Sequence, residues 1–295
     1  MKKFPKVSAA GVTFAVVWGA SVAVLFAFDQ ANGILALSTA GYALLLWFLT
    51  LRLIPQAPDV PADVLRAAGP PARLRVRYAI VGATFVWLMV QSIAAGGTAG
   101  GIHVPGLTPL FAALYHTRTP LHDSATPLFH LLTFVLIPGA LLALFGASAR
   151  QLGLTRPVRG SALATLACLI VPLGMLAWAM SHGKLGFAAL FWLLVHNVLS
   201  NGFSEEFVVR GVIFSHLRAL LTDRWALVAQ ALLFALPHLG DTIPEEHFNG
   251  LLAIANVVGL NAPIGLALGF MALRSRSLVL PTVVHVSLDT MARLV

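Results

Sequence analysis

Apolar residues dominate the chain in long runs, and shorter polar segments separate these runs. Runs of roughly 18 or more apolar residues with few charges are typical of helices that cross a bilayer. The polar segments between them, such as the Pro- and Arg-rich stretch at residues 55–77, predict the connections. The pattern predicts apolar segments at residues 8–28, 34–54, 78–95, 127–147, 161–180, 186–220, 225–240, 248–273 and 278–294.

These runs predict an all-helical membrane protein. The bilayer offers no hydrogen-bond partner to backbone groups, so only helices and closed β-barrels span it. The runs lack the alternation of barrel strands. The predicted fold class is therefore all-α, a polytopic integral membrane bundle of about eight or nine transmembrane helices. Segment 186–220 is too long for one simple crossing at about 1.5 Å per residue. We expect a break at residues 200–202 or a helix that projects beyond the bilayer.

The Lys and Arg residues predict the orientation of the helices, because cytoplasmic loops of membrane proteins carry an excess of both. With the N-terminus inside, the inner side receives all but three of the 19 Lys and Arg residues, the exceptions being Arg118, Lys184 and Arg293. The N-terminus and the loop at residues 55–77 are therefore predicted to be cytoplasmic. The first apolar run is predicted to be an anchor. Short loops and a compact basic N-terminus favour a multi-pass protein of the bacterial inner membrane.

Composition supports this class and argues against others. Of the 295 residues 58% are hydrophobic and 10% are charged, whereas soluble domains have about 25% charged residues. The net charge of +8 is spread over short loops without a basic patch. The expected partner is therefore the lipid bilayer and not a nucleic acid. Cys168 is the only cysteine, so no disulfide framework is expected.

Three groups of ionisable residues lie inside the late apolar runs, where charged side chains are costly and usually face the bundle interior. The first is Glu205, Glu206 and Arg210 within "SEEFVVRG"; the second is His238 in "FALPH"; the third is His285 with Asp289 in "HVSLD". Any one group alone is as well explained by helix packing as by chemistry. Three groups on three helices favour a functional site.

Helical spacing assigns partners within these groups. Glu206 and Arg210 lie four residues apart on one helical face and are predicted to pair. Glu205 is rotated by about 100° from Glu206 and shares its face with Asn201 and Val209, which leaves it available for chemistry. His285 and Asp289 also lie four residues apart.

The motifs resemble those of the CPBP family, the CAAX-protease and bacteriocin-processing group, also called Abi, which includes Rce1-like prenyl proteases. "EEFVVR" resembles its E-E-x-x-x-R motif, "FALPH" its F-x-x-x-H motif and "HVSLD" its H-x-x-x-N/D motif. The three stand in the family's order. Residues 161–295 are therefore expected to form a CPBP-like catalytic transmembrane core, and residues 1–160 to form N-terminal transmembrane helices without a recognisable motif.

The resemblance implies an intramembrane glutamate-dependent endopeptidase. Glu205 and His238 would activate the attacking water, and His285 with Asp289 would stabilise the oxyanion. Glu206, Arg210 and Asn201 are expected to support this site. A carboxyl group in an apolar cavity is a usable base near neutral pH, and donors aimed at the oxyanion supply the electrostatic contribution.

Asp289 departs from the Rce1-type pattern, which has Asn at this position. An ionised Asp cannot donate a hydrogen bond to an oxyanion. We therefore expect Asp289 to hold His285 in one tautomer or as imidazolium.

No other hydrolase motif is present. The chain lacks H-E-x-x-H and G-x-S-x-G, and Cys168 lies in an apolar setting. No cofactor or metal is therefore expected. The alternative is a zinc site, since Glu205, His238, His285 and Asp289 are all possible ligands.

Two other functional classes remain open at this stage. A proton-coupled transporter or channel would use Glu205, His238 and His285 as a relay, and an immunity or scaffold protein would keep the fold without catalysis. Transporters commonly have repeated halves, whereas the intramembrane charges here lie in the C-terminal half. The expected substrate of the protease is a membrane-embedded or hydrophobic-tailed peptide or protein, cut near its terminus.

Two further segments receive structural interpretations. For His196 two positions are open, the cavity of the glutamate pair and the packed interior of the bundle, and the second is favoured. The "PEEH" segment is predicted to be an exposed turn, because Pro244 and Asp241 are typical of a loop.

Overall fold

The computed structural model describes residues 8–55, 71–118 and 124–292. Within these ranges the secondary structure is helical and contains no strand. The longer helices are α1 (Ala9–Phe28), α2 (Gln30–Leu53), α4 (Pro71–Gly96), α8 (Ser161–Ser181), α9 (Phe187–Asn197), α12 (Asp223–Ala235), α14 (Gly250–Ser275) and α15 (Val279–Ala292). The shorter ones are α5 (Leu107–His116), α6 (Thr126–His130), α7 (Ile137–Leu144), α10 (Phe203–Glu206), α11 (Ser215–Leu220) and α13 (Leu239–Glu245).

Eight helical segments of the described chain are long and apolar enough to cross a membrane. They are Ala9–Phe28, Gln30–Leu53, Pro71–Ala99, Thr126–Leu144, Ser161–Ser181, Phe187–Leu220, Asp223–Glu245 and Gly250–Ser275. The apolar helix α15 is shorter, with 14 residues. The prediction of an all-α polytopic bundle of about eight or nine membrane helices is therefore confirmed.

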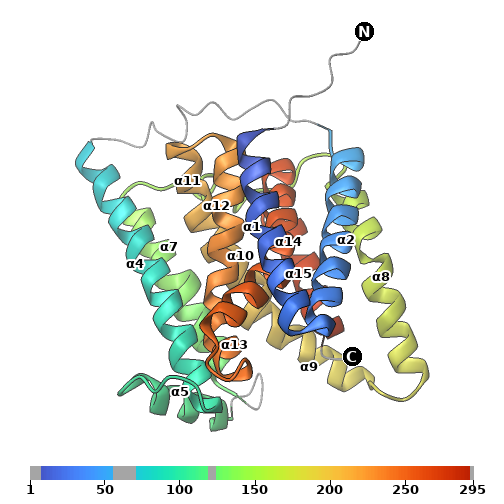
Figure 1. Cartoon of the computed structure of the whole chain (residues 1–295). Helices are drawn as coiled ribbons and strands as arrows, with labels where there is room; N and C mark the ends of the chain where they lie inside the picture. The colour runs from blue at the N-terminus through green and yellow to red at the C-terminus, as the bar shows by residue number, and fades with distance from the viewer. Residues whose placement is uncertain (1–7, 56–70, 119–123, 293–295) are drawn as a thin grey trace.

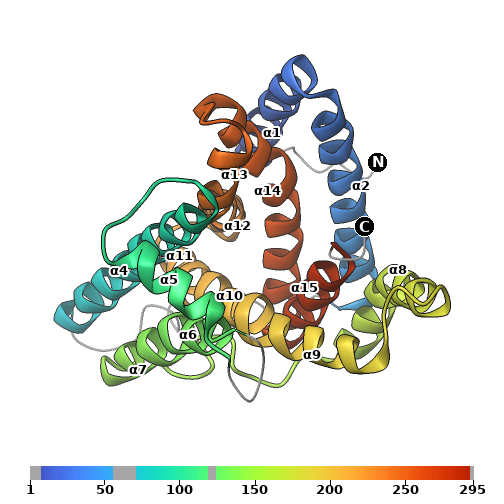
Figure 2. The ribbon, with the colours of Figure 1, turned by 90° about the horizontal axis from the view of Figure 1, so that it is seen from below.

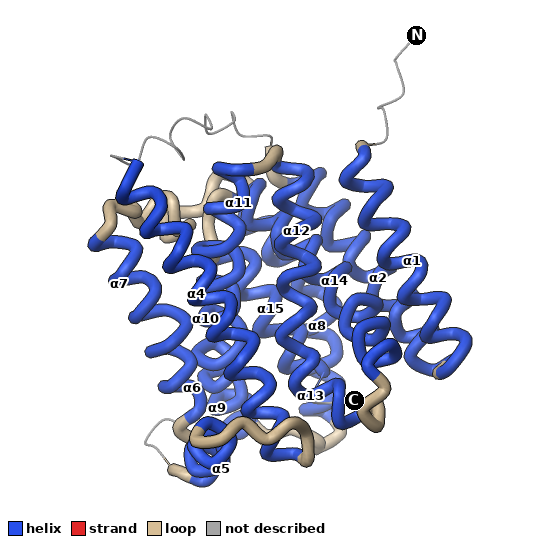
Figure 3. Tube along the Cα trace, turned by 60° about the vertical axis from the view of Figure 1, so that its left-hand side comes forward, coloured by secondary structure: helices blue, strands red, loops and turns tan. Residues whose placement is uncertain are grey.

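The helices run up and down between two faces of the molecule (Figures 1 and 3). The face where α1 begins also holds the connections α7–α8, α11–α12 and α14–α15. The opposite face holds the α1–α2 and α8–α9 connections, α5 and α13. Helix α14 packs against α1, α2 and α12, and α15 packs against α8, so the late helices occupy the middle of the bundle (Figure 2).

The long segment Phe187–Leu220 is helical throughout. No break occurs at residues 200–202; a π-helical stretch, Val198–Gly202, lies there instead, and a second one covers Phe207–Phe214. π-Bulges inside helices are frequent at functional sites. Gly202 lies against α15 so closely that a Cβ would come within 2.2 Å of Val286 Cγ2. This contact brings the Glu205 region against the helix that carries His285.

Two polar segments contain more helix than their composition predicts. Helix α5 lies within the stretch between the third and fourth predicted spans. The predicted exposed turn at "PEEH" is confirmed only in its second half: residues 246–248 form a turn and His247 is exposed, whereas Asp241 and Pro244 lie inside α13. Glu246 ends this helix and accepts a hydrogen bond from the Asn256 side chain at 2.6 Å. Asp241 is therefore held on a helix one turn after His238.

The cytoplasmic orientation of the N-terminus remains a prediction, and the structure changes one part of its basis. Arg210 lies inside a membrane segment and is bound to Glu206, so it does not count as a basic loop residue. The described loop at residues 145–160 lies on the same face as the start of α1 and carries Arg150, Arg156 and Arg159. The other predicted basic loop covers residues 55–77, and its residues 56–70 lie outside the described residues.

Cysteine labelling tests this orientation on described residues. In a Cys168→Ala background, Ala149→Cys should resist an impermeant reagent applied to intact cells, because Ala149 is exposed on the predicted cytoplasmic face. Lys184→Cys, exposed between α8 and α9 on the opposite face, should be labelled. The reverse pattern would invert the predicted topology.

Candidate active site

Glu206 and Arg210 form a fully buried ion pair. Arg210 Nη1 donates to Glu206 Oε1 at 2.9 Å, which confirms the pairing predicted from their four-residue spacing. Arg210 Nη2 donates to the Gly265 carbonyl on α14 at 3.1 Å. The guanidinium also lies over the Phe234 ring, 4.4 Å from its centroid. The Arg210 guanidinium therefore contacts two other membrane segments, through Gly265 and Phe234.

Glu206 also binds His285 from α15. Its Oε1 accepts a hydrogen bond from His285 Nδ1 at 2.9 Å. Because a carboxylate can only accept, this bond fixes the proton on Nδ1 and turns Nε2 toward the remaining acidic groups. Nε2 lies 3.9 Å from Glu205 Oε2 and 3.7 Å from Asp289 Oδ1. His285 therefore lies among three carboxyl groups.

The orienting partner of His285 differs from the one expected from sequence. The prediction gave this role to Asp289, but the hydrogen bond that fixes the imidazole comes from Glu206. Asp289 lies beside Nε2 at 3.7 Å, beyond hydrogen-bond distance. Glu206 lies 79 residues before His285, so helical spacing gave no sign of this contact.

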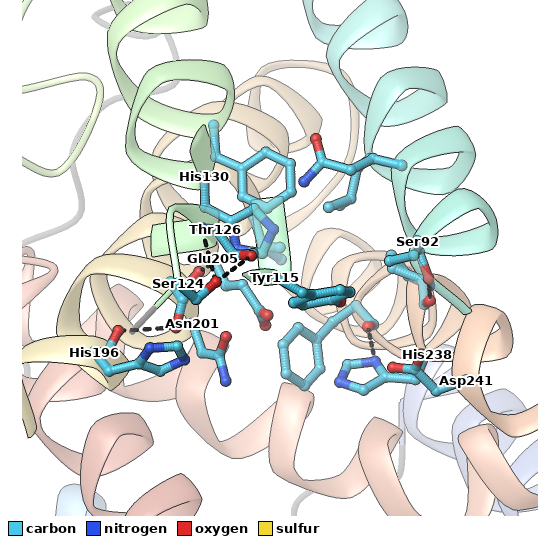
Figure 4. Close-up of a pocket in the computed structure, with 18 residues that line it drawn as sticks. Ser92, Tyr115, Ser124, Thr126, His130, His196, Asn201, Glu205, His238 and Asp241 are labelled. Atoms are coloured by element: carbon cyan, nitrogen blue, oxygen red, sulfur yellow. Dashed lines mark hydrogen bonds between the residues drawn. The ribbon is translucent and has the colours of Figure 1, made fainter. Parts of the chain in front are cut away.

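Glu205 has a different environment from its neighbour. Its side chain is 24% exposed and faces a cavity of about 500 Å³. Asn201 and Val209, predicted to share its face, also line this cavity. Figure 4 shows the labelled side chains of Asn201 and Glu205 directed into the cavity from the same helical segment. The two adjacent glutamates therefore occupy different surroundings, one in the protein interior and one at a cavity.

His238 reaches the same cavity from the end of α12. Its Nδ1 lies 3.1 Å from the Phe234 carbonyl, which can only accept a hydrogen bond. Nδ1 therefore carries the proton, and Nε2 of the neutral ring is left as an acceptor. The residue before it, Pro237, accepts a hydrogen bond from Ser92 on α4. A Cβ on Gly240 would come within 2.2 Å of the Ser92 carbonyl. This close approach of α13 and α4 fixes His238 at the cavity wall.

The rest of the cavity wall was not found by sequence reasoning. Nine lining residues precede the family-like motifs, namely Leu88, Gln91, Ser92, Ala95, Tyr115, Ser124, Thr126, His130 and Phe134. His130 is held by a hydrogen bond between its Nδ1 and the Ser200 carbonyl at 3.1 Å. His196 also lines the cavity, which was the less favoured of its two predicted positions. The only sequence signal for this wall was the presence of polar residues near the ends of apolar runs.

Two predicted catalytic residues lie behind the cavity rather than on its wall. Among the described residues, Glu205, His238 and Asn201 line the cavity, whereas His285 and Asp289 do not. His285 Nε2 lies 3.9 Å from Oε2 of Glu205, which lines the cavity. Within the described ranges, no group of three His, Cys, Asp or Glu side chains is arranged to hold a metal ion.

The C-terminal part of the chain matches a known family. The family model described as "Type II CAAX prenyl endopeptidase Rce1-like" matches residues 184–291. This C-terminal part of the chain is therefore similar to Rce1-like endopeptidases. No match was found among the curated proteins or the solved structures.

The Rce1-like match contains all three motifs and lies within the predicted catalytic core at residues 161–295. The match supports a CAAX-type intramembrane protease at the level of the family, and the eight long apolar helical segments support a multi-pass membrane protein. The match begins after α8, so the helices that supply half of the cavity wall lie outside it. The division at residue 160 remains a prediction.

Proposed function

We propose that the protein is an intramembrane endopeptidase in which Glu205 and His238 activate the attacking water. The observation that carries the proposal is that both residues, from different membrane segments, line one cavity. Glu205 has a carboxyl group without an ion-pair partner within hydrogen-bond distance, and His238 has its Nε2 left as an acceptor. A carboxylate base and an imidazole acceptor can hold one water between them.

The reaction follows from these groups. Glu205 takes a proton from the water, and the water oxygen bonds to the carbonyl carbon of the scissile peptide. The carbonyl oxygen then carries the negative charge of the tetrahedral intermediate. When this intermediate collapses, the C–N bond breaks and the protonated Glu205 gives its proton to the leaving amine. The atoms balance with water as the only co-reactant, and the products are a carboxylic acid and an amine.

His285 has a supporting part in this proposal. Its Nδ1–H donates to Glu206, and its Nε2 lies near Glu205 and Asp289. With Arg210, a protonated His285 offsets the charge of three neighbouring carboxylates. We infer that this buried cluster helps to fix the position of the Glu205 carboxyl group, because His285 Nε2 lies 3.9 Å from its Oε2.

The cavity lies toward the face of the molecule opposite the start of α1. Its wall includes the C-terminal ends of α4 and α12 and a residue of α5, all of which lie at that face. If the N-terminus is cytoplasmic as predicted, the substrate bond is cut near the outer side of the membrane. We propose a membrane-embedded or hydrophobic-tailed peptide as substrate, whose apolar part remains in the bilayer.

Chelation tests the glutamate mechanism against the zinc alternative. The purified protein should keep its peptidase activity after exhaustive dialysis against a strong chelator. In that preparation Glu205→Ala, His238→Ala and His285→Ala should each abolish turnover, while Glu245→Gln, an exposed carboxylate that does not line the cavity, should not. Loss of activity on chelation, with recovery on adding zinc, would reassign these side chains as metal ligands.

Cellular proteomics tests the substrate class. In a strain that lacks the protein, membrane proteins should accumulate that keep a terminal segment absent in the parent strain. Re-expression of the wild-type chain should restore processing, and re-expression of Glu205→Gln should not. If the membrane proteomes of the two strains are identical, the proposed substrate class is wrong.

A further inference from the structure

The ionisable side chains of the described residues that line the cavity include two acids and no Lys or Arg. Among the 18 described residues that line it, the carboxylic acids are Glu205 and Asp241, and none is Lys or Arg. The remaining polar groups are amides, hydroxyls and imidazoles. The two acids would therefore repel a ligand carboxylate, and no Lys or Arg of the described wall would attract it. A cationic ligand would be attracted by both acids.

Asp241 lies at the edge of this cavity, close to the proposed catalytic residues. It follows His238 by three residues along a helical segment, and residues at this spacing lie on the same face of a helix. Figure 4 shows the two side chains together at one side of the cavity. Within the described parts of the chain, Asp241 has neither an ion-pair partner nor a side-chain hydrogen bond. This carboxylate is thus exposed to whatever occupies the cavity.

Tyr115 of α5 adds an aromatic ring to the same region. It lines the cavity and lies within electrostatic reach of Asp241. Burial, and secondarily the charge of Asp241, raises the pKa of the Tyr115 phenol above its ordinary value. An aromatic face next to a carboxylate suits a Lys or Arg side chain, because the ring and the carboxylate both attract the cation.

We propose that Asp241 and Tyr115 form a subsite that binds a Lys or Arg side chain of the substrate next to the scissile bond. This inference rests on the proposed peptidase activity. Asp241 lies one helical turn, about 5 Å along the axis, from His238, so the cationic residue lies close to the cleaved bond in the substrate sequence. The scissile bond is internal, because a free C-terminal carboxylate at this position would be repelled by Glu205 and Asp241.

Charge exchange at Asp241 tests the subsite. Peptides with a hydrophobic tail and with Lys, Gln or Glu scanned through the positions around the cleavage site are compared on wild-type protein, Asp241→Asn and Asp241→Lys. Wild type should prefer Lys over Gln by about five- to tenfold in kcat/KM, as expected for a partly exposed charge pair. Asp241→Asn should abolish this preference, and Asp241→Lys should reverse it in favour of Glu. Glu245→Gln, one turn further on α13, should keep the wild-type preference.

Binding measurements separate this inference from the proposed chemistry. Glu205→Gln protein should bind the Lys peptide more tightly than the Gln peptide, and adding Asp241→Asn should remove the difference. Cleavage without any charge preference would overturn the subsite and leave the peptidase proposal standing. Charge-selective binding without cleavage by the wild-type protein would overturn the peptidase proposal and leave the subsite standing. Equal binding and equal cleavage of Lys, Gln and Glu peptides would disprove the subsite.

Discussion

Replacing Glu205 by Gln should abolish peptide cleavage and leave the folded protein intact. The Glu205 side chain is 24% exposed and lines the cavity, and His285 Nε2 lies 3.9 Å from its Oε2. Gln has the same size, so the substitution removes the proton acceptor without opening a space in the bundle. Loss of a positioned general base costs about a hundred- to ten-thousandfold in rate.

The measurement is turnover of a hydrophobic-tailed peptide by protein purified in detergent, together with the thermal unfolding midpoint. Glu205→Gln should unfold within a few degrees of wild type. Glu245→Gln is the matched control, since it removes a carboxylate from an exposed position outside the cavity and should keep full activity. An active Glu205→Gln enzyme would show that another group activates the water.

Much of the fold follows from the sequence because the bilayer imposes a simple rule. Each apolar run must satisfy its backbone hydrogen bonds internally, so its length and composition predict a helix directly. Helix α5 was not predicted, because a helix of ten residues is too short to be recognised as a membrane-spanning apolar run. The π-helical stretch at Val198–Gly202 was missed for another reason. It lies where Gly202 packs closely against Val286, and sequence periodicity contains no information about packing between distant helices.

The same distinction applies to the site. Contacts within one helix, such as Glu206 with Arg210, follow from a spacing of four residues and were predicted. The shared cavity face of Asn201, Glu205 and Val209 was predicted in the same way. The bond from His285 to Glu206 joins two membrane segments and depends on how they pack. Local spacing suggested Asp289 as the partner of His285 and could not show that a distant carboxylate lies closer.

The second large effect is expected at Glu206, where substitution should damage the fold as well as the activity. Glu206 Oε1 accepts from both Arg210 and His285, and the residue is fully buried. Gln at this position keeps one oxygen but removes the charge that offsets Arg210. It also places an amide N–H₂ where Glu206 Oε2 has no hydrogen-bond partner in the described structure. Breaking a buried ion pair from one side typically costs about 3–5 kcal/mol, so Glu206→Gln should lower the unfolding midpoint and the folded yield.

A double variant distinguishes the loss of the ion pair from a general intolerance to substitution. Glu206→Leu with Arg210→Met removes both buried charges and replaces them with apolar side chains, which often restores stability to near the wild-type level. We expect the double variant to recover a large part of the folded yield lost in Glu206→Gln. It should remain inactive, because His285 Nδ1 has lost the carboxylate that fixes its proton. Wild-type stability of Glu206→Gln alone would mean that Arg210 is sufficiently stabilised by the Gly265 carbonyl and the Phe234 ring. Equal loss of yield in Glu205→Gln and Glu206→Gln would instead make both glutamates structural and would overturn the choice of Glu205 as the base.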